Sequence, residues 1–169
     1  MLCVIAIIDK NSRDQLLKVQ SIGEKFGIPP RHLHGHITLA TYLGSEEDAF
    51  ISSCKETLSK YRTCTVRYEK IQILSATSII VATPSRDSTL TDMQKGISDH
   101  WHEEMDHWTR ADVWEPHTTL VHKPGFDLEP AAKAMQKIFE PFSAIIDRIE
   151  FSRVCENGYE ILETVPLKN

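Results

Sequence analysis

The chain has 169 residues, of which 41% are hydrophobic and 25% are charged, and its formal net charge is −5. These proportions are ordinary for a globular protein and exclude a disordered chain or a fibre. The length predicts one domain, or two small lobes that share a core. Proteins that hold long nucleic acids usually carry an excess of basic residues, so we expect a small or terminal substrate and no extended nucleic-acid surface.

The longest apolar run, over residues 1–8, is far shorter than the ~20 residues that a membrane span needs. No basic segment precedes this run and no cleavage pattern follows it, so the sequence predicts neither a signal peptide nor a membrane partner. The cysteines form no Cys-x-x-Cys pair, and a chain of this length needs no disulfides to fold. We therefore expect a cytoplasmic protein with free thiols at Cys3, Cys54, Cys64 and Cys155.

Hydrophobic spacing predicts strands and helices that alternate along the chain without a linker. In chain order we expect a strand over 3–9, a helix over 12–26, a strand over 36–42, a helix over 46–61, strands over 63–74 and 77–83, a helix over 89–108, a strand over 117–122, a helix over 127–140 and strands over 142–154 and 159–165. Ser75-Ala76 is expected to be a tight connection, and Asn157-Gly158 is a strong hairpin signal.

Two of these helices carry more specific expectations. Ser12 lies three residues before Gln15, a spacing that predicts a capping box at the start of the first helix. In the helix over 89–108, six large apolar residues recur every three or four positions and are expected to face the core. They are Leu90, Met93, Ile97, Trp101, Met105 and Trp108.

The order of elements occurs twice, which indicates an internal repeat. Each half gives a strand, a helix, a strand that begins with a histidine, a second helix and then further strands. We expect an α/β (α+β) fold over 1–169, a single bilobal unit with two lobes related by a pseudo-twofold axis. The boundary between the repeats is expected near 75–85, with strands that the lobes could exchange.

The chemistry is carried by a His-x-Thr-Leu motif that occurs once in each half, beginning at His36 and at His117. Residues two apart in a strand point to the same face, so His36 projects beside Thr38, and His117 beside Thr119. The intervening and following apolar residues face a core. One such motif is a weak signal, whereas two copies at equivalent places in a repeat are much more specific.

Two imidazole–hydroxyl pairs that face each other suit phosphodiester cleavage. One histidine can take a proton from the attacking oxygen while the other gives a proton to the leaving oxygen, because imidazole titrates near neutral pH. Threonine hydroxyls can donate hydrogen bonds to the phosphoryl oxygens as their charge grows. This arrangement needs no metal and no cofactor. The motif's pseudo-symmetry leaves open which histidine is the base.

These two signatures, the chain length and the two-lobed order resemble the two-histidine (2H) phosphoesterase superfamily. That family includes the 2′-5′ RNA ligase-like proteins and the cyclic nucleotide phosphodiesterases. The resemblance implies two antiparallel sheets that line a central cleft, with helices outside. It also implies that His36 and His117 are the acid and base, and that Thr38 and Thr119 bind phosphate. Many family signatures have proline before the histidine, whereas here Gly35 precedes the first motif.

The implied substrates are 2′,3′-cyclic phosphates, ADP-ribose cyclic phosphate and 2′-5′ linkages, and some family members join RNA ends. We therefore expect a phosphoesterase that hydrolyses 2′,3′-cyclic phosphate or 2′-5′ linkages of a nucleotide or an RNA end. The chain has no glycine-rich phosphate loop for ATP, so any joining of ends would reverse transesterification. The oligomeric state stays open.

Residues around the motifs are weaker candidates. Continued alternation along the two strands would put Tyr42 and Lys123 on the same face as the threonines, where they could contact substrate. His34 shares its parity with His36 and could lie at the mouth of the site. Trp114 comes just before the second motif and is expected to be a packing residue.

Two alternatives from other functional classes stay open. The same cleft could bind an RNA end or a nucleotide without catalysis. A zinc-dependent hydrolase could instead use the helix over 89–108, where four potential ligands share a face. These are His100, Glu103, Glu104 and His107. However, His102 and His107 are five residues apart, which does not match the four-residue spacing of the His-Glu-x-x-His pattern, so we expect no metal there.

Overall fold

The computed structural model describes residues 1–30, 32–74, 77–155 and 158–168. In this part of the chain the predicted alternation is confirmed. The elements are β1 (Leu2–Ile8), α1 (Lys10–Gln20), η1 (Ser21–Phe26), β2 (His36–Tyr42), α2 (Glu47–Leu58), β3 (Cys64–Ile73), β4 (Ile79–Pro84), α3 (Ser88–Trp101), η2 (His102–Glu104), η3 (His107–Thr109), β5 (Thr118–His122), α4 (Glu129–Ile138), β6 (Phe142–Cys155) and β7 (Gly158–Pro166). The predicted turn residues at 75–76 and 157 lie outside the described residues.

The first helix begins earlier than the capping-box spacing predicted. Asp9 is its N-cap, and an oxygen of its carboxylate accepts a hydrogen bond from the backbone N–H of Ser12 at 3.0 Å. A carboxylate at this position satisfies one of the free N–H groups of the first turn and interacts favourably with the helix dipole. Ser12 therefore lies inside the helix.

Helix α3 ends at Trp101, seven residues earlier than its apolar stripe predicted. The chain leaves the helix because Met105 forms a bridge with Tyr42 of β2, and Asp106 then caps the short helix η3. Met105 is buried, whereas the side chain of Trp108 is 65% exposed. The expectation that Trp108 faces the core is therefore wrong.

The described strands form one antiparallel seven-stranded sheet, in the order β2-β1-β6-β3-β4-β5, with β7 paired to β6. If β1 is exchanged with β4, β2 with β5 and β3 with β6, the same order results, read from the other end. A repeat related by a pseudo-twofold axis requires this symmetry. The long strand β6 pairs with β1 along its second part and with β3 along its first part. The two expected sheets are thus halves of one sheet that is continuous through β3 and β6.

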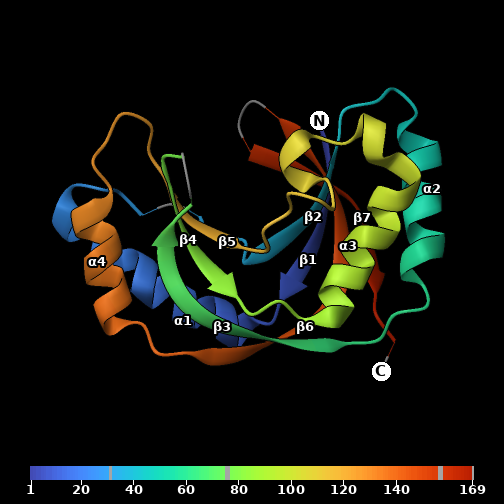
Figure 1. Ribbon diagram of the computed structural model, residues 1–169. Coiled ribbons are helices and arrows are strands. Elements are labelled where there is room, and N and C mark those ends of the chain that lie inside the picture. Colours follow the sequence, from blue (N-terminus) through green and yellow to red (C-terminus); the bar gives the residue numbers. More distant parts are fainter. Residues whose placement is uncertain (31, 75–76, 156–157, 169) are drawn as a thin grey trace.

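Two helices cover each half of the sheet, and each pair includes one helix from each repeat (Figure 1). Helices α2 and α3 pack beside β2, and helices α1 and α4 pack on the half that contains β3 and β5. The first helix of each repeat therefore packs against the histidine strand of the other repeat. One contact fixes this exchange, because the buried side chain of Gln20 donates a hydrogen bond from Nε2 to the carbonyl oxygen of Leu120 at 2.7 Å.

The hairpin of β6 and β7 is as predicted, with pairs running from Arg148–Pro166 to Cys155–Gly158. The four cysteines are free. Among the helices that the structure describes, none combines the length and the apolar composition needed to cross a lipid bilayer.

Candidate active site

The two histidine strands, β2 and β5, lie at opposite ends of the pairing order and yet meet in space (Figure 1). The hydroxyl of Thr118 donates a hydrogen bond to the carbonyl oxygen of His36 at 2.9 Å. The indole N–H of Trp114 donates to the carbonyl oxygen of Thr38, also at 2.9 Å. The first bond joins the two motifs directly, and the second joins the segment before the second motif to the first motif.

A buried tyrosine supports this junction from below. Tyr68 is fully buried, and its hydroxyl lies 2.5 Å from Oγ1 of Thr118. Because the hydroxyl hydrogen of Thr118 is directed to His36, the hydroxyl of Tyr68 is the donor to Thr118. The hydroxyl of Tyr68, the hydroxyl of Thr118 and the carbonyl of His36 thus form a hydrogen-bonded relay, which connects β3 to the backbone of the first motif.

We expect Thr118→Val to lower the free energy of unfolding by about 1–3 kcal/mol, because it leaves the buried hydroxyl of Tyr68 without this acceptor and removes the hydrogen bond to the carbonyl of His36. Chemical denaturation measures this loss. The matched control is Thr118→Ser, which keeps the hydroxyl and is expected to retain most of the stability. A valine variant as stable as the wild type would contradict the relay.

Burial along the two motifs follows the predicted alternation. The histidine and threonine of each motif are half-buried, whereas the residues between and after them are buried. The half-buried residues are His36, Thr38, His117 and Thr119. The buried ones are Ile37, Leu39, Thr118 and Leu120.

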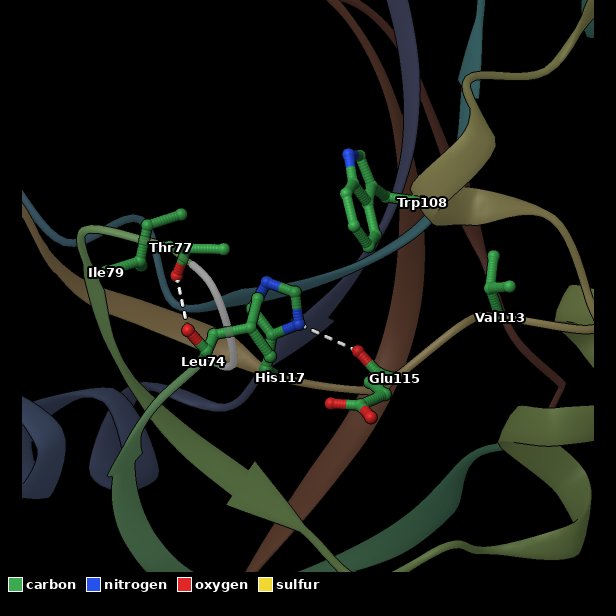
Figure 2. Close-up of a pocket in the computed structure, with 7 residues that line it drawn as sticks. All are labelled: Leu74, Thr77, Ile79, Trp108, Val113, Glu115 and His117. Atoms are coloured by element: carbon green, nitrogen blue, oxygen red, sulfur yellow. Dashed lines mark hydrogen bonds between the residues drawn. The ribbon is translucent and has the colours of Figure 1, made fainter.

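Two adjoining cavities open at the junction, and both include Ile79 in their walls. We call the first the imidazole cavity; it has a volume of about 260 Å³ and is lined by His32, Leu33, His34, His36, Ile79, Thr118, Thr119, His122 and Tyr159. We call the second the indole cavity; it has a volume of about 290 Å³ and is lined by Leu74, Thr77, Ile79, Trp108, Val113, Glu115 and His117 (Figure 2). Of the four histidine and threonine residues predicted to form the site, Thr38 lines neither cavity.

Three of the four predicted residues, one or more from each motif, therefore line these cavities. His36 and Thr119, which are distant in sequence, share the imidazole cavity, and His117 lies in the wall of the indole cavity beside it.

The ring of His117 is held in one orientation. Its Nδ1 lies 2.7 Å from the carbonyl oxygen of Glu115, so Nδ1 carries a hydrogen and donates it (Figure 2). In the neutral ring this leaves the lone pair on Nε2. Burial lowers the pKa of His117 below its ordinary value, and the contact with Glu115 offsets only part of that effect. His117 is thus suited to accept a proton near neutral pH.

The wall of the imidazole cavity is also supported by a buried hydrogen bond, between His34 and Glu150, that sequence reasoning missed. Glu150 of β6 is 4% exposed, and its carboxylate accepts a hydrogen bond from Nε2 of His34 at 2.7 Å. Arg148 approaches the other oxygen at 3.3 Å, and the ring of Tyr159 packs edge-on against His34. A buried carboxylate needs such partners, so Glu150 fixes the orientation of His34 in the cavity wall.

Tyr42 does not contact this site, contrary to its predicted place. It is 2% exposed and stacks on Phe50 in the core, with ring centroids 4.3 Å apart. The reason is a β-bulge in β2: Val4 pairs with Ala40 while the next residue, Ile5, pairs with Thr38. The extra residue reverses the alternation, and Tyr42 turns to the core face.

The same irregularity occurs at the equivalent place in β5. Ile80 pairs with Val121 while Val81 pairs with Thr119. Since Ile79 and Val81 share a face, so do their partners, His122 and Thr119. His122 therefore lines the imidazole cavity, a position that simple alternation did not predict.

Lys123 is displaced from the site by this second bulge. Its ammonium donates to the carbonyl oxygen of Gly27 at 2.7 Å and lies over the ring of Phe126. It lines a separate cavity with Ile28 and Pro29. Lys123 therefore lines neither of the two cavities at the motifs, whereas His34 does lie in the wall next to His36.

The zinc alternative loses its structural basis, because the helix face on which it depended does not exist. Helix α3 ends before His102, and His107 belongs to η3. Nδ1 of His100 instead lies 3.0 Å from the carbonyl oxygen of Gly96. Within residues 1–30, 32–74, 77–155 and 158–168, no group of three or more histidine, cysteine or acidic side chains is placed to hold a metal ion.

The fold thus places one His-x-Thr motif on each terminal strand of a pseudo-symmetric sheet and brings the two motifs into contact. This is the arrangement that the resemblance to the two-histidine phosphoesterases implied. The chain belongs to the 2′-5′ RNA ligase superfamily, whose family profile matches residues 10–156. The resemblance drawn from the two motifs is thereby confirmed. A comparison with curated protein sequences gives no match.

Solved structures share the whole fold. The TT0787 protein of Thermus thermophilus matches with a TM-score of 0.70 at 17% identity, covering 99% of this chain and 98% of that chain. E. coli LigT in complex with 3′-AMP matches with a TM-score of 0.67 at 13% identity, covering 99% and 97%. Usb1 of Kluyveromyces marxianus matches with a TM-score of 0.51 at 10% identity, covering 98% and 97%. The predicted fold class is confirmed.

Proposed function

We propose that the protein is a metal-independent phosphoesterase that acts on 2′,3′-cyclic phosphate or 2′-5′ linkages of nucleotides or RNA ends. His36 and His117 form the acid–base pair, and Thr38 and Thr119 bind the phosphoryl oxygens. One observation carries this proposal: the two motifs are hydrogen-bonded to each other, through Thr118 and the carbonyl of His36, beside two adjoining cavities.

The surroundings of His117 favour it as the base for cleavage of a linear ester. In a 2′-5′ linkage, Nε2 takes the proton of the neighbouring 3′-hydroxyl, whose oxygen attacks phosphorus. The bond from phosphorus to the 5′-oxygen breaks, and His36 protonates that oxygen. The products are a 2′,3′-cyclic phosphate and a free 5′-hydroxyl.

Hydrolysis of the cyclic phosphate then uses the same groups in the opposite sense. His36 takes a proton from water, the hydroxide attacks phosphorus, and His117 returns a proton to the ribose oxygen that leaves. In both steps the threonine hydroxyls donate hydrogen bonds to the non-bridging oxygens, where charge accumulates in the transition state. The imidazolium supplies positive charge, so the mechanism needs no metal.

The nucleotide class of the substrate is supported by structures of a similar protein. E. coli LigT has been crystallised with 3′-AMP, with phosphate, with ATP and with NADP+. We propose that a nucleotide or RNA end is likewise the partner of this chain. Its cytoplasmic location stays a prediction, with which the four free cysteines are compatible.

The pH dependence should show which histidine is the base. His117 must be neutral to accept a proton, and its pKa lies below the ordinary 6.5. As the pH is lowered from neutral to 6.5, we therefore expect no acid-side loss of kcat/KM for a 2′-5′ dinucleotide. It should fall only as the pH drops through the lowered pKa. A pH–rate profile measures this limb. A midpoint above 6.5 would contradict the assignment of His117 as the base.

Turnover in the presence of a chelator tests the function itself. The substrates are nucleoside 2′,3′-cyclic phosphates and 2′-5′ dinucleotides, and the proposal expects hydrolysis of at least one class. The alternative is a protein that binds an RNA end or a nucleotide in the same cavities without catalysis. It expects saturable binding of 3′-AMP with no turnover of either substrate class.

A further inference from the structure

Trp108 is the most exposed of the three tryptophans. Its side chain is 65% exposed, whereas Trp114 is buried and Trp101 packs against the core. Single exposed apolar side chains are common, so the setting of the indole is what distinguishes it. Trp108 lines the indole cavity beside His117 (Figure 2).

The backbone that carries this indole is fixed to the first histidine strand. The side chain of Asp106 accepts a hydrogen bond from the N–H of Trp108 at 3.0 Å, and the N–H of Asp106 donates to the carbonyl of Thr41 at 2.8 Å. The N–H of Thr41 in turn donates to the hydroxyl of Thr109 at 3.1 Å. The backbone that carries Trp108 is therefore held in place, and binding against the indole requires little ordering of the main chain.

The walls of the indole cavity suit a flat, uncharged group. Leu74, Ile79 and Val113 supply aliphatic surface, and Glu115 brings the one carboxylate. No lysine or arginine occurs among the described residues that line it. A second phosphate would be disfavoured here. A volume of about 290 Å³ is near the lower end of the ~300–1,000 Å³ usual for small-molecule pockets.

We propose that the indole cavity binds the nucleobase of the nucleoside whose ribose bears the reacting phosphate, with Trp108 as the stacking residue. The site then selects nucleotides over sugar phosphates that lack a base at that ribose. This inference rests on the proposed function, since it takes the phosphate to lie next to His117 and the imidazole cavity. With the base against Trp108, the attached ribose reaches His117 and the phosphate lies towards His36 and Thr119.

A pair of substrates with the same reacting centre tests the selection. Adenosine 2′,3′-cyclic phosphate carries a base, and methyl β-D-ribofuranoside 2,3-cyclic phosphate does not. We expect kcat/KM of the wild type to favour the nucleotide by about 5- to 150-fold, the factor that corresponds to the stacking of one base on an aromatic side chain.

Three variants show whether this factor belongs to the indole. Trp108→Ala should abolish the preference by lowering kcat/KM for the nucleotide alone, and Trp108→Phe should restore most of it. Phe126→Ala removes an exposed aromatic side chain outside both cavities and should leave the preference unchanged. Equal kcat/KM for both substrates in the wild type, or an equal loss for both in Trp108→Ala, would overturn the inference.

A binding measurement separates this inference from the proposed function. If the wild type turns over neither of these substrates nor a 2′-5′ dinucleotide, the proposed function fails, and calorimetry with 3′-AMP and ribose 3-phosphate repeats the comparison without chemistry. Tighter binding of 3′-AMP that depends on Trp108 would still support the base site. Equal affinities for the two ligands would overturn it.

Discussion

Replacement of either His36 or His117 by alanine is expected to lower kcat by about 10²–10⁴-fold, the usual contribution of a positioned general acid or base. The two residues lie in adjoining cavities, and Thr118 joins their strands through the carbonyl of His36. Each variant removes one of the two proton transfers and leaves the other histidine in place. Steady-state assays with a 2′-5′ dinucleotide and a 2′,3′-cyclic phosphate measure the loss.

The combination of the two variants is informative because the histidines act in the same step. The double variant should lose much less than the product of the two single effects, as is typical of catalytic groups that work as a unit. His100→Ala is the matched control, since His100 is exposed on α3 and bonds within its own helix. Full activity in both single variants would eliminate the mechanism.

The second large effect is expected from the threonines. Thr38→Val and Thr119→Val keep the shape of the side chain and remove the hydroxyl, and each should lower kcat by about 10²–10³-fold, as loss of an oxyanion donor does. The loss should appear mainly in kcat, because the donor acts on charge that develops in the transition state. Steady-state kinetics with the same two substrates separates kcat from KM.

Serine and a remote threonine provide the controls for this series. Thr38→Ser and Thr119→Ser retain a hydroxyl and should keep most of the activity. Thr65→Val makes the same chemical change on an exposed position of β3 and should have no effect. If the valine variants at Thr38 and Thr119 behave like Thr65→Val, the hydroxyls do not bind the reacting phosphate.

Much of the fold follows from local sequence patterns. The alternation of strands and helices was predictable because apolar residues recur with the period of each element, and the repeat was visible in the order of these elements. The His-x-Thr pairs were placed correctly on half-buried positions, since the alternation holds from His36 to Thr38 and from His117 to Thr119.

What the sequence did not reveal depends on contacts between distant segments. The bulges after Thr38 and Thr119 are set by pairing with β1 and β4, so the wrong faces were assigned to Tyr42 and Lys123. The early end of α3 depends on the bridge between Met105 and Tyr42. No local signal marks either feature, because the partner strand determines it.

The wall of the site was predictable only in part for the same reason. Glu150 pairs with His34 across more than a hundred residues of chain, and nothing in its neighbourhood on β6 distinguishes it from a surface glutamate. His122 lines the imidazole cavity because of the bulge in β5, and Tyr159 lines it because β7 pairs with β6. His34 was found because it shares parity with His36.

The central claim is that both imidazoles bind one phosphate, and NMR of the histidine ring nitrogens tests it most directly. Inorganic phosphate is titrated into protein labelled with ¹⁵N in its histidines. We predict that the ring signals of His36 and His117 shift together with a single Kd, while those of His100 stay in place. A response of only one of the two rings, or two separate affinities, would contradict a shared phosphate site.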